Sequence, residues 1–430
     1  MTNRFIQVHF LTSYAATLLN RDDVGFAKRI PFGGAVRTRV SSQCLKRHWR
    51  AFDGEHSLRS LGEDMSLRSR QTFEQKVVAA LLAEGHDEAA VRALAAALRD
   101  VVLGAKEKKA DDGDAKKADK KGAGKGKKGA EAEAPPADGE GGGERAVNTD
   151  QVTVLGLKEV EFFQGIVRDL VKAGTAPGDA RKAVEKFFTK ERVENLRGLK
   201  RAAGLDAALF GRMVTSDYLA RGDAALHVAH ALTVHEELTE NDYFSAVDEL
   251  KAGRDDESLG SGHIGTSELT SGLFYGYVAV DVPLLVSNLE GCKREAWEKA
   301  DRALAGRVID ALVHMVATVS PGAKLGATAP HANAHAVIVE SGNGQPRTLA
   351  NAFVNPVVSK ARDQRQHDLV GNTYDALAAY VADLDENYGA TERRWLALGP
   401  KERLAAGLGT DKREKGLVGL ASWAAKQVGA

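Results

Sequence analysis

Residues 37–50 read RTRVSSQCLKRHWR, and this stretch predicts a strand that leads directly into a helix. Arg37 and Arg39 alternate with β-branched residues, so both guanidinium groups leave the same face of an extended chain. Ser41 or Ser42 then provides an N-cap for the helix. The backbone N–H groups at such a helix start are available to an anion beside the two arginines.

The helix that follows the serines has one apolar side and one basic side. At about 100° per residue, Leu45, Trp49 and Phe52 fall on a single stripe that packs against a core. The opposite side carries the cations Lys46, Arg47 and Arg50. The pattern therefore predicts a docked helix with a cationic outer face. A solvated basic helix on an unrelated globular protein is the alternative interpretation.

Positive charge is concentrated around this element. Between Asn20 and Arg50 the chain has eight Lys or Arg against two acidic residues, whereas the whole chain has 59 basic and 59 acidic residues. Gly33 and Gly34 lie just upstream of the strand, and glycines allow a backbone to approach a polyanion closely. The segment therefore predicts a polyphosphate partner.

The overall composition fits a protein from a reducing, aqueous compartment. At 430 residues with 43% hydrophobic content, the chain can bury a core and should contain two or more structural units. The two cysteines, Cys44 and Cys292, provide neither a disulfide framework nor a thiolate metal cluster. The strand-like run 5–11 is too short for a membrane span and lacks a cleavage signature, so we expect a cytoplasmic protein without a membrane partner.

Residues 104–147 contain almost no large apolar side chain. A Lys-rich half, 106–128, precedes an acidic half, 131–144, so the segment partly neutralises itself. Such a stretch cannot bury enough apolar area to offset its ordering entropy, and we expect it to be disordered. Its lysines could attract nucleic acid loosely, but a plain flexible insertion is the favoured interpretation.

Two kinds of hydrophobic pattern surround this insertion. Helical spacing is found at 75–102, with a break at 85–87, and again at 160–171 and 180–199. Strands are predicted at 5–11, 37–40, 273–280 and 335–339, and a long amphipathic helix at 294–318. Strands with a covering helix, interrupted by a helical subdomain, predict an α+β sandwich.

A series of short motifs runs through nearly the whole chain. The first are residues 19–23 (LNRDD), 32–34 (FGG) and 39–47 (RVSSQCLKR). Others follow at 211–216 (GRMVTS), 223–225 (DAA), 228–231 (VAHA), 242–248 (DYFSAVD), 263–266 (HIGT), 271–275 (SGLFY), 319–324 (VSPGAK) and 349–353 (LANAF). In this order they resemble the CasC family, the backbone subunits of the type I-E CRISPR surveillance complex Cascade. The least similar parts are about 59–206 and the tail after about residue 360.

The resemblance implies a fold that periodicity alone would not name. It is a modified ferredoxin-like or RNA-recognition-motif palm with an inserted helical fingers domain and a protruding thumb. The expected boundaries are palm at 1–58, fingers at 59–208, palm at 209–222, thumb at 223–269, and palm with the C-terminal region at 270–430. The insertion at 104–147 then belongs to the fingers.

The resemblance also implies a non-catalytic scaffold that binds CRISPR RNA along its spacer and polymerises with copies of itself into a helical filament. The guide would pair with target DNA, and other Cascade subunits would be partners; no cofactor or metal is expected. Contacts to phosphates do not read sequence, so one subunit design serves any spacer.

Residues are carried over to this function motif by motif. Met213 is expected to pack on bases, and Phe244 with Ser245 to form part of a wedge that displaces a base at regular intervals. The other RNA-binding candidates are Asn20, Arg21, Lys28, Arg37, Arg39, Ser41, Ser42, Gln43, Lys46, Arg47, Arg50, Arg212 and Lys324.

Two other functions are compatible with parts of the sequence. Asp22 and Asp23 could hold a divalent metal in an RNA-cleaving effector subunit, although a turn or a salt bridge is the favoured role for them. A general single-strand-binding protein would present aromatic platforms for stacked bases, but aromatic residues make up only 6% of this chain.

Three further patterns are interpreted as structural. Residues 274–278 (FYGYV) approach an aromatic RNA-stacking pattern but lack its leading basic-glycine pair, so core packing is favoured. On a strand, His227 and His230 point to opposite faces, which is a poor arrangement for a shared metal, and with His235 they are assigned structural roles. The run before Lys324 lacks the glycine spacing of a phosphate loop. No active site is expected.

Overall fold

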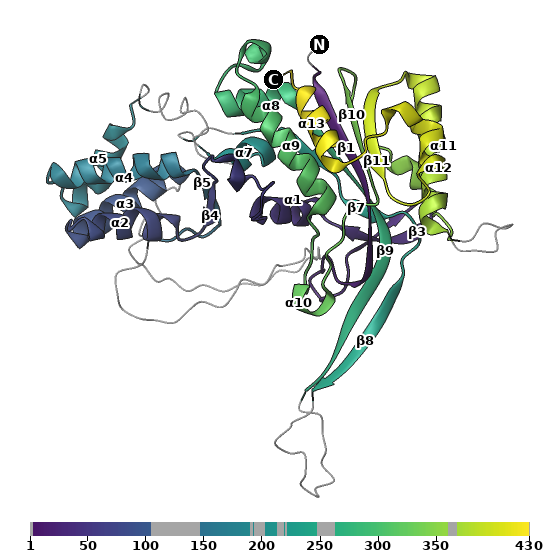
Figure 1. Cartoon of the computed structure of the whole chain (residues 1–430). Helices are drawn as coiled ribbons and strands as arrows, with labels where there is room; N and C mark the ends of the chain where they lie inside the picture. Colours follow the sequence, from purple (N-terminus) through teal and green to yellow (C-terminus); the bar gives the residue numbers. More distant parts are fainter. Residues whose placement is uncertain are drawn as a thin grey trace, which may run out of the picture.

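The structure is a computed structural model that describes residues 3–104, 147–189, 192, 203–212, 219, 222–246, 263–359 and 368–429. Figure 1 shows a large sheet with helices packed around it, a helical unit beside it, and a long ribbon that projects from the body. The predicted disorder at 104–147 falls outside the described residues except at its two ends. Met213 also lies outside them.

The body of the molecule is built on one antiparallel sheet. In spatial order its strands are β11 (Glu392–Ala397), β10 (Ala336–Gly342), β1 (Phe5–Thr17), β9 (His263–Asp281), β7 (Ala231–Thr233), β3 (Ala35–Val40) and β2 (Arg29–Phe32). Two more strands, β6 (Leu226–Val228) and β8 (Thr239–Ala246), pair with β9. All four predicted strands are present, and most of them extend beyond the predicted bounds.

Strand β1 lies inside the sheet, paired on both edges, and both of its faces are covered. Every residue from Ile6 to Leu11 is buried. Val8 pairs with Val339 of β10 on one side and with Val278 of β9 on the other. A continuous buried run of this kind belongs to a central strand.

Helices pack on both faces of the sheet. One face is covered by α1 (Ser42–Ala51), α8 (Val282–Glu290), α9 (Ala303–Thr318) and α13 (Leu417–Lys426). The other is covered by η5 (Ala350–Phe353), α11 (Leu369–Tyr388) and α12 (Lys401–Leu408). Successive residues of β10 enter different cores: Val337 and Val339 pack in the first, Ala336 and Ile338 in the second. The chain is a mixed α+β protein, as predicted.

The predicted continuous helix at 294–318 is wrong in its first part. A short turn η4 (Arg294–Lys299) is followed by a break, and α9 begins only at Ala303. The carboxylate of Asp301 accepts a hydrogen bond from the Ala303 amide at 2.9 Å, which satisfies a free donor at the new helix start. Trp297 is still buried, so the helical spacing of apolar residues continues from η4 into α9 although the chain changes direction between them.

The helical unit beside the sheet has a hydrophobic core of its own. It contains η2 (Phe73–Val78), α2 (Ala79–Ala83), α3 (Glu88–Leu103), α4 (Leu157–Lys172), η3 (Pro177–Asp179) and α5 (Ala180–Phe187), with a small sheet of β4 (Leu67–Ser69) and β5 (Thr153–Leu155). The predicted break at 85–87 is confirmed: Gly85 has a φ of 84°, and Asp87 caps α3. The helix predicted at 180–199 is wrong in its continuity, because α5 ends at Phe187 and the next two residues are not helical. The remaining short elements are η1 (Arg59–Leu61), α7 (Leu205–Phe210), α10 (Leu325–Thr328) and η6 (Thr410–Lys412).

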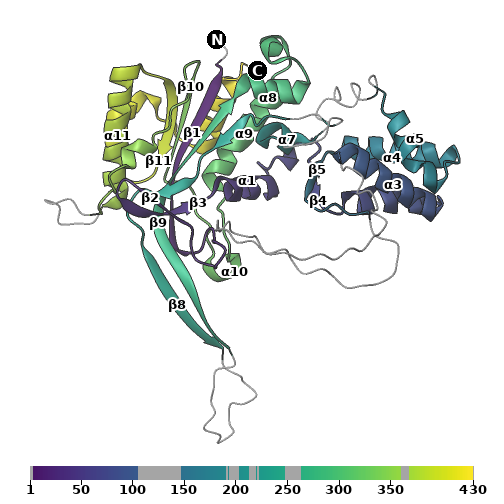
Figure 2. The ribbon, with the colours of Figure 1, turned by 180° about the vertical axis from the view of Figure 1, so that it is seen from behind.

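The ribbon is formed by β8 and the first part of β9. Their register runs from Thr239↔Thr270 to Ala246↔His263. Both views in Figures 1 and 2 show it extending well beyond the sheet. In the described part of the chain, no helix is both long and apolar enough to cross a membrane.

Candidate nucleic-acid interface

The basic helix α1 starts and packs as its sequence predicts. Ser41 is the N-cap, and its Oγ accepts a hydrogen bond from the Cys44 amide at 3.3 Å. The Ser41 amide donates in turn to Asn20 Oδ1 at 2.9 Å, so Asn20 holds the helix start in place. Leu45 and Trp49 are buried in the core. The polar side of α1 is thereby fixed toward the outside.

The three cations of α1 differ in exposure. Arg47 is exposed, whereas Lys46 and Arg50 are partly buried. Burial lowers the pKa of Lys46. The pKa of Arg50 is lowered first by burial and then by the positive charge of Arg68. Like charges gathered in this way favour the approach of an anion.

Two arginines that the sequence analysis did not single out belong to the same cluster. The charges of Arg59 and Arg68 both act on Arg50. The Arg68 guanidinium lies 3.3 Å from the buried carboxylate of Asp206. Arg59 lies in the connection between α1 and the helical unit, and Arg68 lies on β4 of that unit. No periodic pattern marks either residue, and only the fold brings them to α1.

A second basic position lies where β3 ends and β2 begins. The Arg39 amide donates to the carbonyl of Lys28 at 2.8 Å, which places these two residues side by side. The Arg39 guanidinium donates to Nδ1 of His230 at 2.9 Å. Burial, then the charges of Arg39 and Lys28, lower the pKa of His230, so its imidazole stays a neutral acceptor. A shallow depression of about 480 Å³ is lined by Asp22, Asp23, Ala27, Lys28, Arg29 and Arg39.

Asp22 forms a turn, which confirms the favoured interpretation. Its Oδ1 accepts hydrogen bonds from the amides of Val24 at 3.1 Å and Phe26 at 2.8 Å. Arg21 forms an isolated bridge with Ala27 across this turn, and both Arg21 and Asp23 are exposed. The carboxylate of Asp22 is therefore used by the backbone of its own loop.

Arg37 is placed differently from the prediction. Its side chain is fully buried, and its guanidinium donates to the carbonyls of Thr233 and Phe353, each at 3.0 Å. Burial lowers its pKa. The strand pattern correctly places Arg37 on the same face of β3 as Arg39. At the Arg37 end of the strand, however, this face is covered by segments that lie more than a hundred residues away in the sequence. The burial removes Arg37 from any surface that RNA could reach.

Arg212 is likewise internal. It is 4% exposed and forms a two-pronged ion pair with Glu159 of α4, with N···O distances of 2.6 and 2.9 Å. Such a buried pair satisfies both charges within the chain. The structure therefore gives Arg212 a role in joining the segment after α7 to the helical unit.

Lys324 connects three parts of the molecule. Its Nζ donates to Ser267 Oγ at the base of the ribbon, at 2.8 Å. The preceding loop reaches α1, since the Gly322 amide donates to His48 Nε2 at 3.3 Å. Ser42 is partly buried and Gln43 is exposed at the start of the same helix. The basic side of α1 and the ribbon base are thus linked through one loop.

The ribbon presents two neighbouring aromatic side chains. Tyr243 is 63% exposed and Phe244 is 42% exposed. Phe244 pairs with Gly265, and its ring lies against the position that a Gly265 side chain would occupy. Ser245 is exposed beside it. Because successive residues of a strand point to opposite faces, the two rings lie on different sides of the ribbon.

The patterns interpreted as structural have internal contacts. Phe274 and Tyr275 are buried on β9, which confirms core packing for the aromatic strand. His235 is buried, and its Nε2 accepts a hydrogen bond from the Leu273 amide at 3.1 Å. His227 is exposed on β6, apart from the contact between His230 and Arg39.

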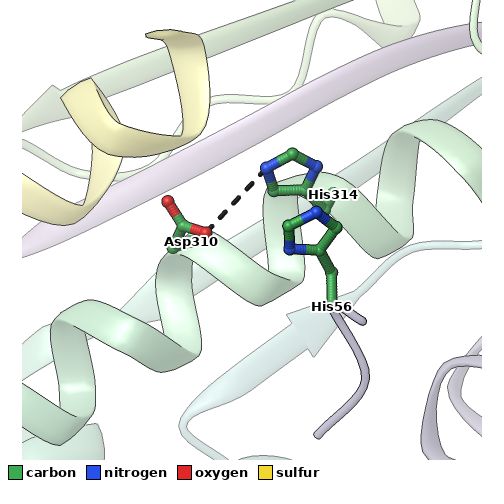
Figure 3. Close-up of side chains that lie close together, drawn as sticks. All are labelled: His56, Asp310 and His314. Atoms are coloured by element: carbon green, nitrogen blue, oxygen red, sulfur yellow. Dashed lines mark ion pairs between the residues drawn. The ribbon is translucent and has the colours of Figure 1, made fainter. Parts of the chain in front are cut away.

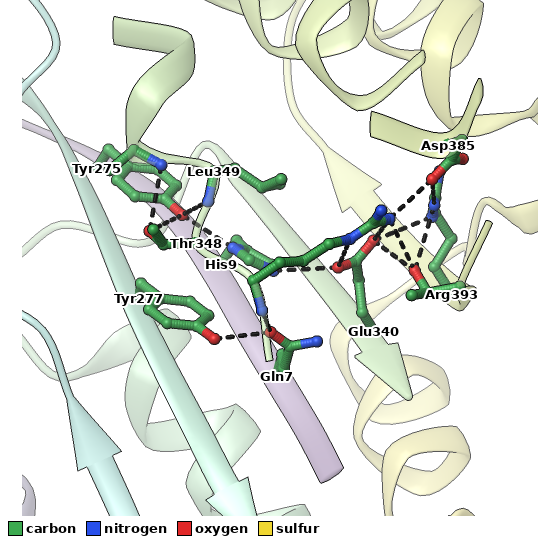
Figure 4. A network of polar contacts seen from close by, with 12 residues as sticks. Gln7, His9, Tyr275, Tyr277, Glu340, Thr348, Leu349, Asp385 and Arg393 are labelled. Carbon is green, nitrogen blue, oxygen red and sulfur yellow. Dashed lines mark hydrogen bonds and ion pairs between the residues drawn. The ribbon is translucent and has the colours of Figure 1, made fainter. Parts of the chain in front are cut away.

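A buried polar network that sequence reasoning missed joins the sheet to α11 (Figure 4). Glu340 on β10 is fully buried, with Arg347 at 3.0 Å and Arg393 at 3.3 Å from its Oε1. His9 Nε2 lies 3.6 Å from its other oxygen. Both arginines also contact Asp385 of α11, each at 2.7 Å. The network ties strands to a helix and lies away from the basic surface.

Comparisons with known proteins agree with this architecture. A subunit of a "CRISPR RNA-guided surveillance complex, pre-nicking" superposes with a TM-score of 0.70 at 24% identity, covering 99% of this chain and 100% of the other. A second, from a "CRISPR RNA-guided surveillance complex", gives 0.63 at 21% identity, covering 98% and 99%. No curated protein sequence matches the chain. The CT1975-like protein family matches residues 6–423, and the chain therefore belongs to that family.

Proposed function

We propose that this protein is a backbone subunit of a CRISPR surveillance complex that binds guide RNA without cutting it. The observation that carries the proposal is a pair of basic positions, the outer side of α1 and Lys28 with Arg39, next to a projecting ribbon. The two positions are neighbours, since the charges of Arg47 and Lys28 both act on Cys44. The similarity in fold to chains of CRISPR RNA-guided surveillance complexes supports it. The motifs at 19–23 and 39–47 favour type I-E Cascade, and CasC in particular.

In this proposal the guide backbone lies on the basic surface. Arg47 and Lys46 offer charges to phosphates, and Arg39 with Lys28 extends the surface toward the ribbon. Such contacts supply affinity without reading bases. Phe244 at the ribbon displaces a base at intervals, and the bases between these positions stay available to target DNA. The sheet is then the palm, the helical unit the fingers and the ribbon the thumb.

Copies of the protein associate head to tail along the RNA, together with other subunits of the complex. A heterologous interface that does not close gives an open helical filament rather than a ring. The length of the filament is then set by the RNA and the capping subunits. The protein works in the cytoplasm, where the guide and its partners are found.

The proposal is tested by reversing charge on α1. Lys46→Glu/Arg47→Glu should weaken guide RNA binding equally for two unrelated spacers and reduce the slope of affinity against salt, because phosphate contacts are lost. Lys415→Glu changes an exposed lysine outside this surface and is the matched control. An effect restricted to one spacer, or an unchanged salt slope, contradicts the assignment.

The non-catalytic part of the proposal is tested separately. The Asp22 carboxylate already accepts hydrogen bonds from two backbone amides of its own turn, so its role in this structure is to stabilise the loop. The assembled complex, incubated with guide-complementary RNA and Mg²⁺, should leave that RNA intact. Regularly spaced cuts that disappear in Asp23→Asn would instead identify an RNA-cleaving subunit.

A further inference from the structure

Three potential metal ligands, His56, Asp310 and His314, meet beside α9. His56 comes from the segment after α1, and Asp310 and His314 come from successive turns of α9 (Figure 3). One ligand atom from each lies within 4.8 Å of the other two. Among the described residues, this is the one group of three or more His, Cys, Asp or Glu side chains that meets this distance criterion.

The cluster is not explained by hydrogen bonding between its members. Nε2 of His314 lies 3.9 Å from Asp310 Oδ1, which is longer than a hydrogen bond. The rings of His56 and His314 are stacked, with centroids 3.6 Å apart and planes 7° apart. His314 is only 5% exposed on an otherwise apolar helix face. Two imidazoles and a carboxylate brought together in this way form a donor set typical of Zn²⁺.

The spacing of the helical pair suits a shared ion. Residues four apart on a helix lie one above the other, so Asp310 and His314 present their side chains to the same point. The ligands of a tetrahedral zinc site lie about 2.0–2.2 Å from the metal. The present separations require the ligand atoms to draw together by an ångström or so.

The stacked rings must separate for both to bind one ion. The lone pair of an imidazole nitrogen lies in the ring plane, so two nearly parallel rings with centroids 3.6 Å apart cannot both direct a lone pair at one ion. His56 is the ring able to turn, because it is half-buried and lies outside any helix or strand. A cavity of about 340 Å³, which Glu55, His56, Asp310 and Arg307 help to line, provides room. Arg307 and Lys426 also line this cavity, and the Arg307 guanidinium is held away from the ligands by donating to the Leu61 carbonyl at 3.2 Å. Glu55 is a further acid in the same lining.

We propose that His56, Asp310 and His314 bind one Zn²⁺ ion after His56 turns toward α9. Glu55 or a water molecule completes a four-coordinate site. The ion would join the segment that leaves α1 to the long helix α9. The cationic helix would then be held at both ends, by its N-cap and by the metal. None of the three ligands is a proposed RNA-binding residue, so the site does not depend on the proposed function.

The test uses the full chain, freed of metal with a chelator. Addition of Zn²⁺ should raise the melting temperature, and calorimetric titration should give one ion per chain. Co²⁺ should give the visible absorption of a tetrahedral site. His56→Asn, which alters a half-buried side chain, should lower the Zn²⁺ affinity by more than about tenfold and remove the Co²⁺ band. Asp310→Asn should act in the same direction.

A matched control separates this site from adventitious histidine binding. His227→Asn changes an exposed histidine on β6 and should leave the affinity, the stoichiometry and the Co²⁺ spectrum unchanged. The proposal is overturned if wild-type protein shows no rise in melting temperature. It is equally overturned if the rise persists in both His56→Asn and Asp310→Asn, because the ion would then bind elsewhere.

Discussion

Arg37 and Arg39 lie two residues apart on β3 and point to the same face, yet their surroundings differ completely. Arg37 is enclosed and donates to two carbonyls, while Arg39 lies beside Lys28 and His230 in a more open position. The difference follows from what covers each end of the strand. This pair offers a direct comparison between a structural arginine and one that we propose binds RNA.

Arg37→Met should lower the free energy of unfolding by about 2–3 kcal/mol, because buried carbonyls lose a charged donor. The salt slope of guide binding should stay at the wild-type value in protein that folds. Arg39→Met, the matched variant, should leave stability almost unchanged and reduce that slope. Chemical denaturation and binding at several salt concentrations measure both quantities. A reduced slope in Arg37→Met would return this residue to the interface.

Side-chain periodicity identified the correct face for Leu45 and Trp49 because a helix turns by a fixed angle and one face must meet the core. It could not show that Arg37 and Arg212 are buried. Their partners, at Thr233, Phe353 and Glu159, come from other segments, and no local pattern records them. The sequence therefore predicts which residues share a face, but not which part of a face other segments cover.

The β8–β9 ribbon carries Phe244 opposite Gly265, so the ring has two possible uses: shielding a bare backbone or pressing on a nucleotide. Phe244→Ala should cost far less than the about 3–5 kcal/mol of a buried phenylalanine, because the ring is 42% exposed. In Phe244→Ala, the regular pattern in which guide bases react with a base-modifying probe should become less distinct. Target capture should weaken more than guide retention.

Tyr243→Ala is the control, since it removes an exposed ring from the other face of the same strand. The periodic pattern should survive in this variant. A large loss of melting temperature in Phe244→Ala with an unaltered pattern would assign the ring to ribbon packing alone.

The ends of the insertion are anchored to the helical unit. Gly104 closes α3 with a φ of 69°, and the buried Val147 donates its amide to Glu74 at 2.7 Å. Arg99, near the end of α3, donates to the Asn148 carbonyl at 2.9 Å, so the two ends lie close together.

Replacing residues 105–146 with a short Gly-Ser linker should change the free energy of unfolding by less than about 0.5 kcal/mol and leave guide binding intact. Extending the deletion through Asn148 should destabilise the protein, because it removes the Val147 and Arg99 contacts. Thermal denaturation and assembly with guide RNA distinguish the two. If the protein with the shorter deletion is destabilised or does not assemble, the insertion contributes to the folded structure.

Element types were well predicted where the pattern was long, as in β1 and α3. The prediction failed at 294–318 because a helical spacing of apolar residues continued through a bend. Trp297 and Leu304 reach the same core from two separate elements. Periodicity records only the side that faces the core. The Asp301 carboxylate, which accepts from the first amide of α9, was the local sign that a new helix begins there.

The whole molecule depends on the buried network around Glu340, which links the sheet to the α11 layer. Burial raises the pKa of Glu340, but the nearby His9 ring and the hydrogen bond and charge of Arg347 together lower it well below 4.5. Its contribution to stability is therefore present above about pH 4.5 and is lost as the pH falls toward the lowered value.

Glu340→Gln should destabilise the protein by about 3–5 kcal/mol at pH 7, because Arg347 and Arg393 lose a buried counter-charge. The difference from wild type should narrow as the pH falls below about 4.5, by up to about 1.4 kcal/mol per pH unit. Urea denaturation at pH 7, 5 and 4 measures this. A difference that is constant over that range would show that the charge of Glu340 is not the stabilising feature.

This network could not be predicted from the sequence. Its members, such as His9, Glu340 and Arg393, are separated by up to several hundred residues and have no shared spacing. The same holds for His56 with His314. In contrast, the α+β class and the basic surface of α1 follow from local patterns, because each is encoded within one continuous segment.

One strand, β9, is both the edge of the projecting ribbon and the central partner of β1. Its 19 residues, at about 3.3 Å each, span roughly 60 Å without interruption. Its glycines do not act as joints inside the body, since Gly272 is packed against Thr233 and Gly276 against Phe10. If a growing duplex pushes sideways on the ribbon tip, the bending force is therefore transmitted along β9 into the sheet. The hydrogen-bond ladders on both sides of β9 share that load, and the middle of the sheet resists it as one stiff body.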